Sequence, residues 1–281
     1  VPVQIPSQLI KSLIGLKGFH QESFEKLHAS HEQITSIRWN PHKKKMVEKE
    51  DSKFNNQNSK IENSQNISVR LPTPDSQLPT TASRLPALTP VPWSTQGYYL
   101  SQRPSFTFDP LFHAGCYYVQ EASSMFLEEA LKQTIDLRTD NRVLDLCAAP
   151  GGKSTLIQSI LSPQSLLLSN EVIKSRAVIL EENITKWGGA NVIITNNDPV
   201  DFARIGNFFD SIVIDAPCSG SGLFRRDPGA IEEWSEQNVQ HCSQRQQRII
   251  SDVLPALKKN GILIYSTCSY SEQENEDILD W

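Results

Sequence analysis

A glycine-rich turn follows a short apolar run in the middle of the chain. The stretch Arg142–Ser154 reads Arg-Val-Leu-Asp-Leu-Cys-Ala-Ala-Pro-Gly-Gly-Lys-Ser, which predicts a strand, a turn and a helix that begins near Lys153. Gly151 and Gly152 allow backbone angles that other residues avoid, so main-chain N–H groups can approach a ligand closely. The stretch therefore predicts a cradle for a cofactor or a phosphate group, although a plain tight turn also fits it.

The residue spacing weakens the phosphate alternative. A P-loop has the pattern Gly-x-x-x-x-Gly-Lys-Ser/Thr. Gly152-Lys153-Ser154 fits its end, but Cys147 stands where the first glycine is required. Because Ser211–Asp215 imitates the acidic strand of P-loop enzymes, a nucleotide hydrolase is a third, weaker hypothesis.

Acidic residues follow the next three predicted strands. Glu171 comes about 20 positions past the glycines, where a carboxylate can accept both ribose hydroxyls of a nucleoside. Asp198 can receive an adenine amino group or an ammonium, and Asp215 begins the run Asp-Ala-Pro-Cys-Ser-Gly. Each alone is more often a helix cap than a ligand. Their regular placement, and the repulsion between carboxylates and phosphates, favour the cationic S-adenosylmethionine as cofactor.

These side chains can meet only if a sheet brings the strand ends together. The sequence predicts strands over 142–146, 166–169, 191–195, 211–215 and 262–266, with helices near 153–161, 173–187 and 237–258. Such alternation predicts an α/β fold with a mostly parallel sheet and helices on both faces. Ligands of such sheets lie outside the carboxyl ends of the strands.

Composition narrows the class of protein. The chain has 281 residues, 38% of them hydrophobic and 21% charged, and no apolar run approaches the roughly 20 residues of a membrane helix. Five cysteines without a C-x-x-C pair argue against a disulfide framework or a zinc site. We expect a cytoplasmic monomer with no metal and no membrane partner. The net charge of -5 does not by itself indicate nucleic acid.

The first 90 residues differ from the rest. A helix is predicted to begin near Ser7 and break near Gly15, followed by a helix over 22–31 and a strand over 36–40. We expect residues 1–42 to form a small N-terminal α+β subdomain. Residues 43–90 are rich in Lys, Asn, Gln, Ser, Thr and Pro, which predicts a mobile insertion or linker because little apolar surface can be buried. Residues 91–281 then form the main domain.

Three motifs occur in an order typical of one enzyme family. They are Cys147-Ala-Ala-Pro-Gly-Gly-Lys153, Asp215-Ala-Pro-Cys-Ser-Gly220 and Ser266-Thr-Cys-Ser-Tyr270, the last followed by Glu272-Gln-Glu-Asn-Glu276. With these motifs the chain resembles the Nol/Nop/Sun family of RNA cytosine-C5 methyltransferases. The resemblance covers about residues 91–281, including an upstream motif over 112–126, and residues 1–40 loosely.

The resemblance implies a class I methyltransferase (Rossmann-like) fold with S-adenosylmethionine as methyl donor. It implies methyl transfer to C5 of a cytosine in RNA, with rRNA favoured over tRNA, and an RNA-binding role for residues 1–42. Cytosine C5 is a poor nucleophile, so a thiolate first adds to C6 and the enamine that results attacks the methyl group.

The family's motifs assign the catalytic roles. Cys268 matches the nucleophile, Cys218 matches a second cysteine used in product release, and Asp215 matches an acidic residue near the target base. Placement at strand ends beside Gly and Ser favours exposure of both thiols. The other cysteines are expected to be buried as small apolar side chains: Cys116, Cys147 and Cys242.

The cofactor contacts implied by the resemblance come from the glycine-rich turn and the acidic strand ends. They are Cys147, Ala148, Ala149, Pro150, Gly151, Gly152, Lys153, Glu171, Arg176, Asp198 and Asp215. Lys153, near a helix start, can meet the cofactor carboxylate. A target base must leave its stack to reach the two sulfurs, which favours single-stranded or loop RNA. Tyr117, Tyr118 and Phe224 are candidates for stacking on it.

Two features depart from the family. Ser211 follows Phe209-Asp210 where a basic residue is frequent, and the chain ends at Trp281, whereas family members continue with two more strands. We therefore expect either a fragment that lacks the end of its sheet or a protein without activity. A non-catalytic RNA-binding relative that keeps the cofactor fold is the main alternative.

Overall fold

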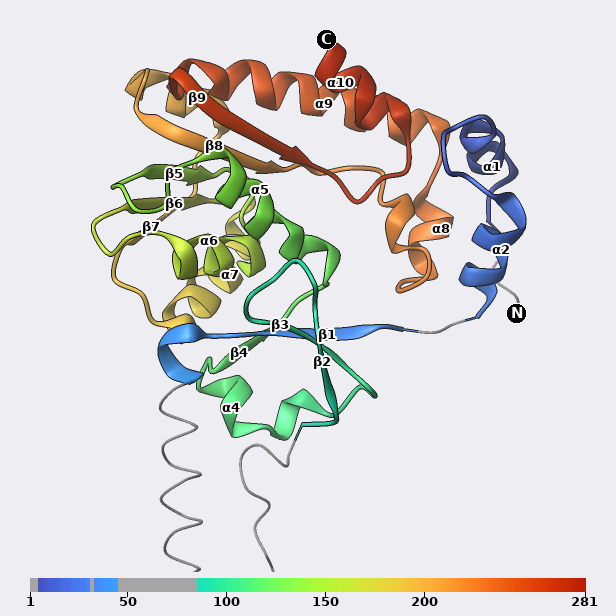
Figure 1. The fold of residues 1–281 in the computed structure, drawn as a ribbon. Coiled ribbons are helices and arrows are strands. Elements are labelled where there is room, and N and C mark those ends of the chain that lie inside the picture. The colour runs from blue at the N-terminus through green and yellow to red at the C-terminus, as the bar shows by residue number, and fades with distance from the viewer. Residues whose placement is uncertain (1–4, 31–32, 45–84) are drawn as a thin grey trace, which may run out of the picture. The chain divides into compact units, whose positions relative to one another are not determined.

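The chain divides into two units, each built on its own sheet. The structure, a computed structural model, describes residues 5–30, 33–44 and 85–281 (Figure 1). The parallel-sheet unit comprises Val1–Ile34, Ala130–Ile184 and Gly189–Trp281, and the antiparallel-sheet unit comprises Thr35–Glu129 and Thr185–Gly188.

Five strands form the parallel sheet in the order β7-β6-β5-β8-β9, and all neighbouring pairs are parallel. The strands are β5 (Arg142–Asp145), β6 (Leu166–Asn170), β7 (Val192–Thr195), β8 (Phe209–Asp215) and β9 (Leu257–Ser266). The chain winds outward from β5 through β6 and β7, and then the other way through β8 and β9. This reversal creates a switch point between β5 and β8, where open α/β sheets bind their ligands.

The helices of this unit lie before, between and after the strands. They are α1 (Ser7–Leu13), α2 (Gln21–Ala29), α6 (Gly152–Ile160), α7 (Lys174–Trp187), α8 (Gly229–Glu233), α9 (Glu236–Val253) and α10 (Glu276–Asp280), while α5 (Leu127–Thr134) leads in from the other unit. Figure 1 shows α9 on one side of the strands and α6 and α7 on the other. The predicted α/β fold with helices on both faces is confirmed.

Alternating side chains of the central strands bury both faces of the sheet. Leu144 and Ile212 belong to a cluster that also contains Ile250 and Val253 of α9. Val143 and Val213 are the neighbours of Leu144 and Ile212 on the same strands, so their side chains point to the opposite face of the sheet. They are also fully buried. Burial on both faces explains why these strands read as continuous apolar runs.

The antiparallel-sheet unit has four strands in the order β2-β3-β1-β4. They are β1 (Thr35–Trp39), β2 (Leu88–Pro90), β3 (Gly97–Leu100) and β4 (Tyr117–Val119), with the short helix α4 (Pro110–His113) before β4. Arg38 is buried in this unit, where its Nε donates to Gln120 Oε1 at 2.8 Å and its guanidinium lies 4.6 Å from the Trp187 ring centre. Burial lowers the pKa of Arg38 to about 9.

The N-terminal boundary differs from the one expected from the sequence. The described residues 5–30, 33 and 34 belong to the parallel-sheet unit, whereas residues 91–129 join β1 in the other unit. The reason is the apolar face of α1, whose Leu9 and Leu13 are buried in a cluster with Phe224, Trp234 and Val239. Of the polar segment predicted over 43–90, residues 45–84 lie outside the described residues.

Helix α9 ends earlier than the predicted 237–258. It stops at Val253, and β9 already begins at Leu257. Pro255 explains the difference because proline has no N–H to donate and clashes with the preceding turn of a helix. The predicted strand over 262–266 is therefore only the second half of β9.

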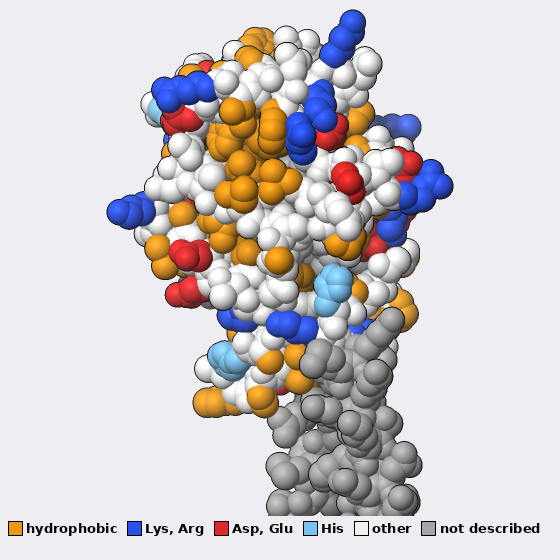
Figure 2. Space-filling model, turned by 90° about the vertical axis from the view of Figure 1, so that its left-hand side faces the viewer, with side chains coloured by type: hydrophobic (Ala, Val, Ile, Leu, Met, Phe, Trp, Pro, Cys, Tyr) orange, Lys and Arg blue, Asp and Glu red, His pale blue; other side chains and the backbone are white. Residues whose placement is uncertain are grey.

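The surface carries several large apolar side chains. In the parallel-sheet unit they include Val172, Ile193, Val200 and Ile205, and Figure 2 shows apolar side chains gathered on the face that it presents. Within the described residues, no helix is both long enough and apolar enough to cross a membrane.

Phe224 is fully buried in the cluster with α1, so its truncation should cost stability. We expect Phe224→Ala to lower the free energy of unfolding by about 3–5 kcal/mol, the usual cost of emptying a buried aromatic site. Phe108→Ala, at a side chain that is 86% exposed, should change it by less than about 0.5 kcal/mol. Urea unfolding followed by circular dichroism measures both. Equal stability of the two variants would contradict the packing.

Candidate active site

The glycine-rich turn lies between β5 and α6. Gly151 has φ 110° and precedes the first residue of α6, a conformation that favours glycine. A Cβ at this position would also approach Leu180 Cδ1 to 3.3 Å. The turn therefore needs a glycine here both for its backbone angles and for close packing against α7.

Three carboxylates surround this turn. Asp145 and Glu171 are buried, and Asp215 is partly exposed at the end of β8. Burial raises the pKa of the Cys147 thiol to about 12, and the charges of Asp145, Glu171 and Asp215 add to the shift. Three carboxyl groups beside the turn favour a cationic ligand over a phosphate group, although Lys153 and Arg176 offset part of their charge.

Two of these carboxylates keep an oxygen without a hydrogen bond among the described residues. Asp145 Oδ2 accepts from Ser154 Oγ at 2.6 Å while Oδ1 has no partner. Glu171 Oε1 accepts from Ile173 N at 3.0 Å, and its Oε2 receives no hydrogen bond although Arg176 Nη1 lies 3.4 Å away. A buried acceptor without a donor is costly, so these oxygens suit the donors of a ligand.

Asp215 joins the turn to the fifth strand. Its Oδ2 lies 2.8 Å from Lys153 Nζ, and its Oδ1 accepts from Ser266 Oγ at 2.9 Å. Since the strand register pairs Asp215 with Ser266, this contact follows directly from the pairing of β8 with β9. Lys153 is thereby held over the carboxyl end of the sheet.

The remaining predicted cofactor residues differ in their surroundings. Arg176 donates from Nη2 to Ala149 O at 2.7 Å, which fixes the turn to α7. Asp198 caps the 3-10 helix η4 (Pro199–Ile205) by accepting from Val200 N, and it forms an ion pair of 2.8 Å with Arg248. Asp198 is therefore both a helix cap and an ion-pair partner, and its role toward a cofactor stays a prediction.

Cys218 and Cys268 lie side by side although 50 residues separate them. Their Sγ atoms are 3.0 Å apart, both thiols are reduced, and Cys268 is exposed while Cys218 is half-buried. The hydrogen bond between them lowers the pKa of Cys218 and raises that of Cys268. The two thiols therefore share one hydrogen bond in which either sulfur can donate.

Backbone contacts hold the two cysteine loops together. Gly222 N donates to Cys268 O at 2.7 Å, and a Cβ on Gly222 would lie 2.6 Å from that same oxygen. Tyr270 N donates to Ser221 Oγ at 2.8 Å. The loop after β8 and the loop after β9 thus pack at a distance that only glycine allows.

Other predicted residues are placed as follows. Cys116 and Cys242 are buried as expected, and Cys147 is half-buried. The stacking role predicted for two aromatic residues is wrong for this structure, because Tyr117 and Phe224 are buried in apolar clusters. Tyr118 is half-buried, and burial raises its pKa to about 12.

Two residues of the site have no role in the sequence-based prediction. Asp145 ends the apolar run that leads into the turn, and Glu274 lies in the acidic run after the Thr-Cys motif. An acidic residue at the end of a buried strand was the available signal for Asp145. The acidic run offered several carboxylates, and nothing in the sequence alone distinguishes the buried one.

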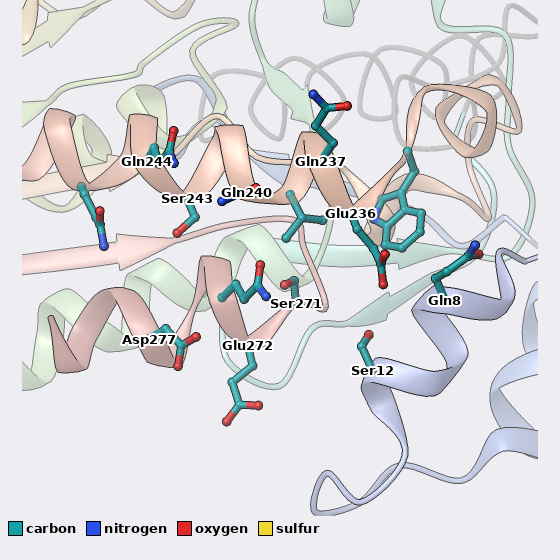
Figure 3. A pocket seen from close by; sticks show the side chains of 14 residues that line it. Gln8, Ser12, Glu236, Gln237, Gln240, Ser243, Gln244, Ser271, Glu272 and Asp277 are labelled. Carbon is teal, nitrogen blue, oxygen red and sulfur yellow. The ribbon is translucent and has the colours of Figure 1, made fainter.

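A polar groove of about 850 Å³ lies between α1, α9 and the segment around α10 (Figure 3). Three of its lining residues are carboxylates, Glu236, Glu272 and Asp277, and none of the described lining residues is Lys or Arg. This lining is unsuited to a phosphate backbone. No cluster of three or more metal-ligating side chains occurs in the described part of the chain.

The strand order, the glycine-rich turn and the acidic strand ends together define a class I methyltransferase fold. Residues 132–281 match the profile of the 16S rRNA methyltransferase RsmB/F family, and residues 44–122 match that of the N-terminal domain of 16S rRNA methyltransferase RsmF. The chain belongs to the RsmB/F family of methyltransferases.

Individual relatives agree with this assignment. The chain is 38% identical over 200 residues to the ribosomal RNA small subunit methyltransferase F of Escherichia coli and of Shigella sonnei, a match that covers 69% of this chain. The matched region spans about two fifths of those relatives, 41% of their length.

Solved structures share the fold. A methyltransferase homolog from Pyrococcus horikoshii has a TM-score of 0.65 and 26% identity, over 99% of this chain and 82% of that one. NSun6 from Pyrococcus horikoshii, solved with SFG, has a TM-score of 0.66 and 20% identity, over 98% and 86%.

Burial raises the pKa of Asp145 from 3.8 to about 7. The folded state therefore keeps a proton that the unfolded state loses, and stability should fall as the pH rises from about 4 to 7. We expect this group to account for a decrease of roughly 4 kcal/mol in the free energy of unfolding over that range. Asp145→Asn should flatten the dependence in urea unfolding series. An unchanged slope in the variant would contradict the raised pKa.

The paired thiols should bind one trivalent arsenical. Phenylarsine oxide forms two As–S bonds with neighbouring thiols and releases its oxygen, with both thiol protons, as water. Because the second bond is intramolecular, Cys268→Ala should weaken binding about 100-fold or more, whereas Cys242→Ala, at a buried thiol, should not. Mass spectrometry and titration measure this. Equal losses in both variants would argue against the pairing.

Proposed function

We propose that this chain carries the catalytic part of an RNA (cytosine-5)-methyltransferase that uses S-adenosylmethionine and acts on rRNA. The observation that carries the proposal is the pair of thiols, Cys218 and Cys268, 3.0 Å apart at the ends of neighbouring strands. Cytosine methylation at C5 needs a thiol that adds to the ring and a group that assists its release. The two thiols lie beside Asp215 and the proposed cofactor turn, which supports a role in addition for one of them and a role in release for the other.

The residues around the turn fit S-adenosylmethionine. The carboxylates of Glu171 and Asp215 supply negative charge for a sulfonium, and Glu171 Oε2, which accepts no hydrogen bond from the described residues, is an acceptor suited to ribose hydroxyls. Lys153 can receive the methionine carboxylate. The bound cofactor supplies the methyl group. The likeness of the fold to a neighbour solved with SFG, an analogue of this cofactor, agrees with this site.

Cys268 is the proposed nucleophile because its thiol is exposed while Cys218 is half-buried. The Cys218 thiolate accepts the Cys268 proton across the hydrogen bond, and the Cys268 thiolate then bonds to C6 of the cytosine. Addition at C6 makes C5 nucleophilic, and a cofactor bound at the turn would supply the methyl group that C5 accepts. Asp215 is placed to bind N3 or the amino group of the base.

Cys218 is proposed to act in the release step. After its proton exchanges with solvent, the thiolate removes the proton from C5 as the bond between Cys268 and C6 breaks. Atoms and charge balance, since the ring regains its double bond and Cys268 leaves as a thiolate. The lowered pKa of Cys218 supports a thiolate at this position.

The substrate class is proposed from the similarity of this chain to known methyltransferases. The relatives matched by this chain are named for methylation of the small-subunit ribosomal RNA, so we propose rRNA as the partner and the cytoplasm as the compartment. The alternative of a non-catalytic RNA-binding relative predicts the same fold and the same cofactor turn. The catalytic and the non-catalytic hypotheses differ in whether the thiols react with the base.

RNA that carries 5-fluorocytosine tests the mechanism. Fluorine at C5 cannot leave as a proton does, so the wild type should form an adduct that survives denaturing electrophoresis. Cys268→Ala should form none, and Cys218→Ala should accumulate it, even with ordinary cytosine, because release is blocked.

Calorimetry supplies the control for that experiment. Binding of S-adenosylmethionine and not of ATP is expected in the wild type and in both variants, since neither thiol belongs to the cofactor turn. Adduct formation by Cys268→Ala would overturn the assignment of roles. A wild type that binds the cofactor but forms no adduct would favour the non-catalytic alternative.

A further inference from the structure

Glu274 is a fully buried carboxylate beneath the cysteine pair. It lies in the 3-10 helix η7 (Glu272–Glu274), just before α10. Its side chain accepts hydrogen bonds from both Ser219 and Ser269, the residues that directly follow the two cysteines in the chain. A charge-bearing side chain is rarely fully buried unless it is paired or fully hydrogen-bonded.

The contacts of Glu274 reach both loops at once. Its Oε1 accepts from Ser219 N at 2.8 Å, and its Oε2 accepts from Ser219 Oγ and Ser269 Oγ, both at 2.5 Å. Gln246 of α9 donates from Nε2 to Oε1 at 3.3 Å and to Pro217 O at 3.0 Å. Hydrogen bonds to a charged acceptor are short and about twice as strong as neutral ones.

The backbone around Glu274 is itself fixed. Tyr265 Oη donates to Glu274 O at 2.7 Å. Asn275 donates from Nδ2 to Ser269 O at 3.1 Å and to Ser271 O at 2.8 Å, and its Oδ1 accepts from Thr267 Oγ1 at 2.7 Å. The carboxylate thus sits on a segment tied to β9 and to the nucleophile loop, so it can hold the other loop against them.

We propose that Glu274 is a positioning residue that sets the separation of Cys218 and Cys268 and so keeps their shared proton in place. The carboxylate touches neither sulfur. It acts through Ser219 and Ser269, each of which is covalently joined to one of the cysteines. The consequence for methylation rests on the proposed function, whereas the consequence for the geometry of the thiols does not.

The charge of the carboxylate is essential to this role. All four hydrogen bonds described above run toward its two oxygens, which an ionised carboxyl can accept. Glutamine has nearly the same shape but presents an NH₂ group that would face donors on one side. Glu274→Gln should therefore loosen one loop. Glu274→Asp keeps the charge but is one methylene shorter, so it should restore part of the function.

The experiment compares Glu274→Gln and Glu274→Asp with Glu272→Gln. Glu272 is exposed and two residues away, so its variant removes the same charge without touching the network. The first measurement is the affinity for phenylarsine oxide, which reports the spacing of the thiols without any RNA. The second is the rate of adduct formation with 5-fluorocytosine RNA, and the third is the affinity for S-adenosylmethionine.

For Glu274→Gln we expect about 100-fold weaker arsenical binding and about 100-fold slower adduct formation, the effect typical of misplacing reacting groups by an ångström. Glu274→Asp should lie between this variant and the wild type. Glu272→Gln should match the wild type. Cofactor affinity should stay within about twofold in all three, because the cofactor turn does not contact Glu274 and only unfolding would remove it.

Should Glu274→Gln fail to fold, Ser219→Ala and Ser269→Ala each delete a single hydroxyl donor and should each give a partial loss of arsenical affinity. The proposal is overturned if folded Glu274→Gln, or both serine variants, bind the arsenical as the wild type does. A wild type that binds the arsenical tightly but forms no adduct would instead contradict the proposed function and leave the positioning role to be judged by the arsenical alone.

Discussion

The parallel pairing of β8 with β9 is the constraint on which the site depends. Its register sets Asp215 against Ser266, and both cysteines follow within three residues of these strand ends. Because parallel strands end at the same edge of a sheet, two loops that are distant in the sequence must meet there. Gly222 and the buried Glu274 then decide how closely they meet.

Electrostatics distinguishes the two halves of the site. Around the glycine-rich turn, the carboxyl groups of Asp145, Glu171 and Asp215 face the cations Lys153 and Arg176. Around the cysteines, the polar groups are serines that converge on a single carboxylate. The first arrangement suits a cationic ligand, and the second suits the control of a proton between two thiols.

Several polar side chains are buried at the carboxyl ends of the parallel strands, where their burial costs free energy. Buried polar side chains contribute to stability only when their partners are in place. Asp145 Oδ1 and Glu171 Oε2 are two of several buried side-chain atoms in the described structure that have no hydrogen-bond partner. These two lie beside the glycine-rich turn, where the donors of a bound ligand could reach them.

Much of this protein could be predicted from its sequence. The apolar runs gave four of the five parallel strands within two residues, because burial on both faces leaves a continuous apolar signal. The motifs around Cys218 and Cys268 singled out the two cysteines whose thiols lie together in the structure. The end of α9 was predicted too late, because Pro255 outweighs the helical periodicity that continues past it.

Residue types and their order by themselves determined the α/β class, the glycine-rich turn and the two cysteine motifs, because these depend on local periodicity and on short motifs. Only the tertiary structure decided that Phe224 is buried, that Asp198 pairs with Arg248, and that Glu274 is the one acidic residue of its run that lies beneath the thiols. Each of these depends on contacts between segments far apart in the chain, for which a single sequence carries no local signal.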